Sequence, residues 1–216
     1  VLYKAACFQQ LGGAPVIRAL LFCLLCLPVC ATAEPLPALY DVNGVSAGDT
    51  LNVREGPSTS FGVIDKLSPG AKDIELITID ETGEWAMVNS GERSGWVALR
   101  YMQRQSGQPI EGLPLKLGCA GTEPFWSFKL MPDRSAEFTR VDQSIAIESV
   151  LIVPSENRPD RHALFADGGD TVITTVIGRN LCSDGMSDQT YGLGIDLLVT
   201  DEAAVHVYSG CCSVLP

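Results

Sequence analysis

Short stretches of alternating apolar and polar residues, separated by tight turns, most constrain how this chain can fold. The clearest is Asp49-Thr-Leu-Asn-Val-Arg-Glu-Gly-Pro-Ser-Thr-Ser-Phe61, which alternates and then enters a Gly-Pro turn. Leu51 and Val53 are expected to face one side of a strand, and Arg54 the other. A second segment, Gly95-Trp-Val-Ala-Leu-Arg-Tyr101, is expected to close the unit. This spacing predicts a small all-β barrel.

The other strands of this first unit follow from the same pattern. Turn residues at Ser68-Pro-Gly70 and Asp80-Glu-Thr-Gly83 separate its apolar segments. The predicted strands cover residues 51–54, 63–67, 74–79, 85–88 and 95–97, and the last two form a hairpin. We therefore predict a β-domain over residues 38–104, which is large enough for one modest core.

The combination of Leu51-Asn-Val-Arg-Glu-Gly-Pro-Ser58 with Gly95-Trp-Val97 resembles the bacterial SH3 domain. The resemblance implies a small barrel used for binding, because members of this family bind cell-wall peptides or act as targeting and interaction modules. It also implies that Trp85 and Trp96 stand at recurrent aromatic positions. The ligand-binding residues predicted for a peptide groove are Arg54, Trp85, Trp96 and Tyr101. The competing interpretation packs both Trp side chains within the barrel and lets Arg54 brace the turn at Glu55.

Residues 1–33 have the pattern of a secretory signal peptide. Arg18 precedes an apolar run at residues 19–29, and Ala31-Thr-Ala33 supplies a cleavage site. The run is shorter than the roughly 20 apolar residues that cross a bilayer, so we expect no stable membrane span after cleavage. The protein is then exported and is periplasmic or associated with the cell envelope.

Other interpretations of this segment stay open. One alternative is an uncleaved anchor. Another is the signal of a lipoprotein acylated at Cys30, but such a signal needs a small residue before the Cys, and Val29 fits this poorly. Val16 stands at a suitable distance before Arg18 to be the true start, in which case residues 1–15 are an over-extension.

The chain is acidic, with 26 acidic and 15 basic residues and a formal net charge of −11. Removal of residues 1–33 would take away Lys4 and Arg18 but no acidic residue. Nucleic acid and anionic membranes are not expected as partners, because both need a positive protein surface. The partner we expect is a peptidoglycan peptide or an envelope protein.

The rest of the chain predicts a linker at residues 105–114 and a second β-domain at residues 115–213. The linker is polar and contains Gly and Pro. In the second domain, short β-prone segments alternate with turns, and no helical period extends over three turns. The predicted strands cover residues 125–130, 135–140, 145–153, 163–166, 171–177, 191–200 and 204–208. We predict an all-β chain, in which a small SH3-like barrel precedes an antiparallel meander or barrel with disulfides.

Four of the eight cysteines lie within the predicted signal peptide. The other four predict two disulfides, because their number is even and the chain is exported. They are Cys119, Cys182, Cys211 and Cys212. A bridge between the adjacent Cys211 and Cys212 is disfavoured, because bridged Cα atoms prefer a separation of about 5.5 Å. Two pairings stay open, and either would fasten the last strand to the body of the domain.

Three motifs mark the second domain: Cys119-Ala-Gly-Thr-Glu-Pro-Phe-Trp126, Cys182-Ser-Asp-Gly-Met-Ser-Asp188 and Tyr208-Ser-Gly-Cys-Cys212. Together they resemble a family of uncharacterised bacterial envelope proteins, which implies no particular activity. Trp126 is also similar to the Trp at the start of the first strand in lipocalin-like barrels. That similarity would imply an interior able to hold a small apolar ligand.

The chain offers few residues for catalysis. A cysteine peptidase needs a thiolate beside a His base, and the two His, His162 and His206, are both expected in strands. A zinc hydrolase needs a larger His cluster. Asp184 and Asp188 lack the spacing of an EF-hand loop, and Glu123 is expected to bond the backbone. We predict no catalytic residue, no metal site and no cofactor.

These observations predict an exported, non-catalytic binding protein of the bacterial envelope. Its SH3-like domain would dock on cell-wall peptide or on a partner protein. The alternative is an envelope enzyme or small-ligand carrier that acts through the second domain.

Overall fold

The structure is a computed structural model, and it describes residues 35–141 and 143–216. This part of the chain forms seventeen strands and a single 3-10 turn at Leu99–Tyr101, so the all-β prediction is confirmed. It lies within one compact unit. None of its helices is long and apolar enough to cross a membrane. The predicted signal peptide at residues 1–33 lies outside the described residues.

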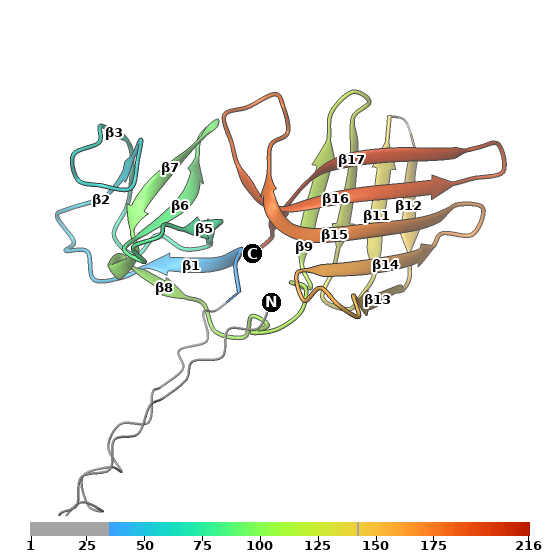
Figure 1. Ribbon diagram of the computed structural model, residues 1–216, viewed down its shortest axis with the longest axis horizontal. Coiled ribbons are helices and arrows are strands. Elements are labelled where there is room, and N and C mark those ends of the chain that lie inside the picture. Colours follow the sequence, from blue (N-terminus) through green and yellow to red (C-terminus); the bar gives the residue numbers. More distant parts are fainter. Residues whose placement is uncertain (1–34, 142) are drawn as a thin grey trace, which may run out of the picture. The chain divides into compact units, whose positions relative to one another are not determined.

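The first region consists of two sheets around one hydrophobic core (Figure 1). Its strands are β1 (Ala38–Val42), β2 (Leu51–Arg54), β3 (Val63–Leu67), β4 (Ile74–Leu76), β5 (Thr78–Ile79), β6 (Trp85–Ser90), β7 (Arg93–Ala98) and β8 (Met102–Arg104). One sheet has the order β4-β1-β8, and the other has the order β3-β2-β7-β6-β5. Leu51 and Val53 are buried between them, as the alternation predicts.

The second region is a nine-stranded antiparallel sheet that curls into a nearly closed barrel (Figure 1). Its strands are β9 (Leu117–Gly121), β10 (Trp126–Leu130), β11 (Ala136–Arg140), β12 (Gln143–Ile147), β13 (Val150–Pro154), β14 (Arg161–Asp167), β15 (Val172–Cys182), β16 (Tyr191–Thr200) and β17 (Val205–Val214). The order is β12-β11-β10-β9-β17-β16-β15-β14-β13. β17 therefore pairs with β9, the first strand of the region, and this pairing joins its two halves.

Side chains fill the interior of this barrel. Phe128, Phe138 and Leu117 are fully buried there, and alternate residues of β16 such as Leu197 point into the same core. In the described part of the chain the interior is thus a packed core, as in small barrels generally. It does not resemble the ligand cavity of a lipocalin.

Strand β1 contributes to both cores. Ala38, Tyr40 and Val42 point into the first region, whereas Leu39 is 5% exposed and belongs to the barrel core together with Leu113. Gln108 fixes this arrangement, because its side chain accepts a hydrogen bond from the N–H of Leu39 and donates one to its carbonyl. The two regions therefore share buried surface.

Several predicted strands are wrong in extent. The apolar run at residues 145–153 forms two strands, β12 and β13, at opposite edges of the nine-stranded sheet. At the start of β13, the N–H of Val150 bonds to the carbonyl of Arg134, and the chain leaves the edge formed by β12. The run at residues 74–79 is likewise divided between two sheets as β4 and β5. Strands β1, β8 and β9 were not predicted.

The disulfides are Cys119–Cys212 and Cys182–Cys211, which resolves the pairing that the sequence leaves open. Cys119 and Cys212 lie opposite each other on β9 and β17, and both belong to the barrel core. Cys211 points to the other side of β17, because successive residues of a strand face opposite sides.

Candidate functional site

A groove of about 260 Å³ opens on the surface of the first region. Arg54, Trp85 and Tyr101 line it together, so the structure gathers three of the four predicted ligand-binding residues. Its volume is just below the range of about 300–1,000 Å³ that is typical of small-molecule pockets. An extended segment of peptide is a suitable occupant, because it fills a groove of this kind along its length.

Trp96 is not part of the groove lining but lies on the same face of the five-stranded sheet. It is paired with Arg54 across β2 and β7, and paired residues point to one side of a sheet. Gly95 faces the core, where a Cβ would overlap neighbouring side chains, so Trp96 must face outward. Trp85 is paired with Ala98, two residues further along β7, and shares this outer face.

Arg54 also braces the turn that follows it. Its Nη1 donates a hydrogen bond of 2.7 Å to the carbonyl of Phe61. The turn needs Gly56, because a Cβ there would lie 2.7 Å from the Phe61 ring. Arg54 thus braces the turn through Nη1, as the competing interpretation proposes, and its side chain also lines the groove.

The turn before β6 positions Trp85. Asp80 accepts hydrogen bonds from the N–H of Trp85 at 2.9 Å and from the hydroxyl of Thr82 at 2.6 Å. The Thr82 hydroxyl and then the backbone N–H groups hold the pKa of the Asp80 carboxyl below its usual value. Gly83 completes the turn with a φ of 74°, which glycine adopts readily. This local network fixes the strand end that carries the indole ring.

Two further charged residues of the groove were not predicted. The guanidinium of Arg100 lies 4.7 Å from the centre of the Tyr101 ring, a cation–π geometry. Asp49 also lines the groove. Asp49 and Arg100 stand just outside the two motifs that carry the SH3 resemblance, and Arg100 lies in the 3-10 turn at Leu99–Tyr101. The groove thus combines the cations of Arg54 and Arg100 with one carboxylate and two aromatic rings.

The Asp-Gly-Met-Ser-Asp motif forms a loop, residues 183–190, that docks on the hairpin of β6 and β7. We call it the docking loop. The N–H of Ser94 bonds to the carbonyl of Asp188, and the N–H of Asp188 bonds to the carbonyl of Glu92. Thr190 donates its N–H to the hydroxyl of Ser94 and accepts a bond from the amide of Asn89. The motif therefore connects the barrel to the strands that carry Trp85 and Trp96.

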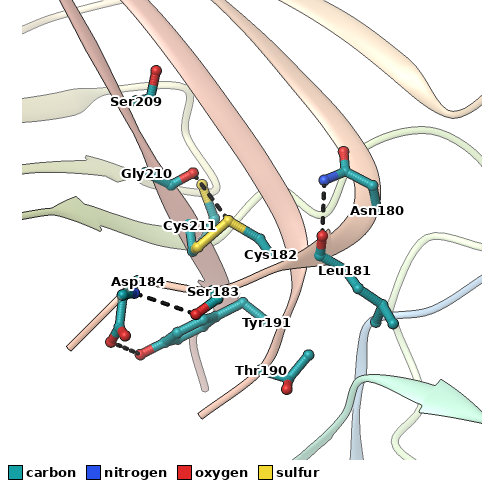
Figure 2. Close-up of a disulfide and its surroundings, with 12 residues drawn as sticks. Asn180, Leu181, Cys182, Ser183, Asp184, Thr190, Tyr191, Ser209, Gly210 and Cys211 are labelled. Atoms are coloured by element: carbon teal, nitrogen blue, oxygen red, sulfur yellow. Dashed lines mark hydrogen bonds between the residues drawn. A yellow bond between two sulfur atoms is a disulfide. The ribbon is translucent and has the colours of Figure 1, made fainter. Parts of the chain in front are cut away.

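Asp184 gives the docking loop its shape. Its carboxylate accepts hydrogen bonds from the N–H groups of Met186 and Ser187 and from the hydroxyls of Ser187 and Tyr191. The backbone bond from Ser187 is the largest cause of the lowered pKa of Asp184. Figure 2 shows Asp184 beside Tyr191, with the Cys182–Cys211 disulfide next to them.

Glu75 forms a second polar contact between the regions. Its Oε1 accepts a 2.8 Å hydrogen bond from the N–H of Val214 at the end of the barrel. Burial raises the pKa of Glu75 to about 7, although bonds from Val214 and Ser213 favour the ionised form. The charge of this carboxyl therefore depends on pH near neutrality.

The cysteine and histidine side chains do not form a nucleophile and base pair in the described part of the chain. All four cysteines of the described chain are in disulfides, so none of them is a thiolate nucleophile. His162 is buried, and burial followed by the charge of Arg179 lowers its pKa. The Nε2 of His206 lies 3.8 Å from the carboxylate of Asp201 at the far end of the barrel. Among the described residues, no three His, Cys, Asp or Glu side chains gather as metal ligands would.

Residues 49–103 match the family model described as a bacterial SH3 domain. The match confirms the resemblance of the first region, and bacterial SH3 domains are binding rather than catalytic domains. The resemblance of the second region to an envelope protein family is not confirmed. The comparison with curated proteins gave no match.

Proposed function

We propose that this protein is exported to the bacterial envelope and binds cell-wall peptide in the groove of its first region. The observation that carries the proposal is the convergence of Arg54, Arg100, Trp85 and Tyr101 in one groove of a segment that matches a bacterial SH3 domain. Two guanidinium groups suit the carboxylates of a peptide, and the rings suit its backbone and side chains.

Two features support the envelope location. The disulfides belong in an oxidising compartment, which the periplasm and cell surface provide. The sequence pattern of residues 1–33 is that of a cleaved signal. We further propose that residues 38–104 are the binding domain and that residues 115–213 form a second domain. Contacts of Gln108 with Leu39 hold the connecting segment of residues 105–114 in place.

Sedimentation with purified peptidoglycan sacculi tests the proposal. The chain from residue 34 should sediment, and Trp85→Ala should weaken its affinity about tenfold, the usual effect of truncating a central aromatic residue. Arg100→Gln should also weaken binding. Its side chain is exposed, so this variant tests the groove without a threat to folding. Phe125→Ala is the control, because Phe125 is 64% exposed on the barrel.

Each contrary result has a separate meaning. If folded Trp85→Ala and Arg100→Gln bind as tightly as the unchanged protein, the groove is not the binding site. If the unchanged protein does not sediment, cell-wall peptide is the wrong ligand.

A further inference from the structure

A second groove, of about 310 Å³, opens on the outer face of the nine-stranded barrel beside the Cys182–Cys211 disulfide. We call it the outer groove. Gly178 and Gly194 lie directly opposite each other on β15 and β16 and are among its lining residues. Neither has a positive φ, so backbone conformation does not explain the absence of a side chain. The absence of a side chain at both positions lets neighbouring polar side chains lie directly over the backbone at the floor of the groove.

Two polar side chains converge above this floor. A Cβ on Gly178 would lie 2.8 Å from Nη1 of Arg161 and 3.0 Å from Oδ1 of Asn180. A Cβ on Gly194 would lie 2.9 Å from Nδ2 of Asn180. Two alanines would therefore occupy the space that these groups now use. The Arg161 guanidinium and the Nδ2 of Asn180 are donors that a carboxylate accepts, whereas the Oδ1 of Asn180, which lies over Gly178, is an acceptor.

The Arg161 guanidinium is available for such an acceptor. Within residues 35–141 and 143–216 it forms no salt bridge and no side-chain hydrogen bond, although, after the hydrogen bonds from Arg158, its charge helps to lower the pKa of the neighbouring Asp160 carboxyl. The Nδ2 of Asn180 donates one N–H to the carbonyl of Leu181 at 3.3 Å, and its second N–H can donate to a ligand. The neighbouring Arg158 differs, because both of its bonds go to the carboxylate of Asp160.

An anion stands further along the outer groove. Asp196 lies on β16 two residues beyond Gly194, and its carboxylate accepts a 2.6 Å hydrogen bond from the hydroxyl of Ser209. Sheet spacing puts Asp196 roughly 8 Å from Gly178, above which the guanidinium lies. One hydrogen bond leaves the carboxylate with capacity for a cation. Figure 2 shows Ser209 and Asn180 with the disulfide that borders the groove.

We propose that the outer groove binds a short zwitterionic peptide. Its terminal carboxylate accepts hydrogen bonds from the Arg161 guanidinium and from the Nδ2 of Asn180, and its ammonium group meets Asp196. An extended chain advances about 3.3–3.6 Å per residue, so two or three residues span the distance. The site shares no lining residue with the groove of the first region, and neither proposal depends on the other.

Titration followed by amide NMR tests the proposal, with the chain from residue 34 and trialanine as the probe. Trialanine should shift the resonances of Gly178 and Gly194. Its C-terminal amide should bind at least tenfold more weakly, because the carboxylate is gone. N-acetyl-trialanine should also bind more weakly, because the ammonium group is gone. Trp85→Ala should leave these shifts unchanged, which separates this site from the proposed function.

Three variants locate the site. Arg161→Gln should abolish the shifts, whereas Arg158→Gln should retain them. Gly194→Ala should abolish them too, because the new methyl fills the floor and displaces only the mobile end of Asn180. Absence of any shift with trialanine, equal binding of its amide, or retained binding by Gly194→Ala would overturn the site. Equal binding of the N-acetyl form would overturn the role of Asp196.

Discussion

Among the described residues, nine buried residues form the core of the first region, whereas twenty-one form the core of the barrel, Leu39 of β1 included. The strands of the first region have two to six residues and depend on turns fixed by side chains such as Asp80. The barrel has strands of up to eleven residues and two disulfides.

The smaller region contains the candidate groove and the segment that matches a bacterial SH3 domain, and it contacts the larger region through the docking loop, Glu75 and Leu39. A small domain buries a lower fraction of its surface and is correspondingly less stable. We therefore expect the barrel to stabilise the smaller region. The following experiments test that relation, from the largest expected effect to the smallest.

Removal of the inner disulfide should have the largest effect on the barrel. The double variant Cys119→Ala, Cys212→Ala opens a bridge between residues 93 positions apart, and should lose about 4 kcal/mol of unfolding free energy. Urea unfolding followed by circular dichroism measures it. If the barrel stabilises the first region, the fluorescence of Trp85 and Trp96 should report unfolding at the same reduced urea concentration, recorded in a Trp126→Phe background because Trp126 lies in the barrel core. An unchanged fluorescence midpoint would show that the first region is independent.

Glu75→Gln should stabilise the protein above neutral pH. Because the folded pKa of Glu75 is raised to about 7, the folded state binds this proton more tightly, and stability is lost as pH rises from the unfolded value through about 7. Gln keeps an acceptor for Val214 without the charge. At pH 8 the variant should gain on the order of 1–3 kcal/mol, and at pH 4 almost nothing.

Thermal unfolding at the two pH values measures this difference, with Glu81→Gln as the exposed control. An equal gain at pH 4 and pH 8 would contradict ionisation of Glu75 as the cause.

Asn89→Ala should weaken the connection between the regions. The Asn89 side chain donates to the carbonyl of Thr190 and accepts bonds from Ser94 and from the N–H of Thr190. Their loss should cost about 1–2 kcal/mol and should separate one unfolding transition into two. Calorimetry measures this, and Asn157→Ala is an exposed control in the turn before β14. A single transition at the original temperature would show that the docking loop contributes little.

Asp80→Ala should have the smallest effect on stability and a clear one on binding. Loss of the bond to the N–H of Trp85 frees that strand end, so affinity for sacculi should fall by a few fold. The lowered pKa of Asp80 means that its contribution is complete above the unfolded pKa and is lost as pH falls through the folded value. The stability difference should therefore shrink as the pH falls through the folded pKa of Asp80.

Asp133→Ala is the matched control for this experiment. Asp133 makes similar bonds to Ser135, but in a turn of the barrel. Equal loss of binding in the two variants would contradict a positioning role for Asp80.

Local chemistry explains which parts of the fold could be predicted from the sequence. The alternation of Leu51 and Val53 and the turn at Gly83 depend on neighbours in the chain. The limits of β9 do not depend on neighbours in the chain. Gly118 and Gly121 weaken its apolar pattern, and the strand is defined by pairing with β17. The run at residues 145–153 has a uniform β pattern, and only closure of the nine-stranded sheet divides it.

The candidate site follows the same rule. Arg54, Trp85 and Tyr101 could be predicted because their motifs resemble a known domain. Asp49 and Arg100 could not, since a fold must bring distant turns together before their charges share a groove. The disulfide pairing depends in turn on which side of β17 each cysteine faces.

That alternation of Cys211 and Cys212 has a consequence for oxidative folding. A slip of β17 by one residue would send Cys211 into the core and Cys212 to the surface, and each would then meet the wrong partner. The long hydrogen-bonded ladder between β16 and β17 could tolerate such a slip far more easily than the two covalent bonds could. The native pair of disulfides therefore forms only when β17 is in its native position, and it then holds the last strand there.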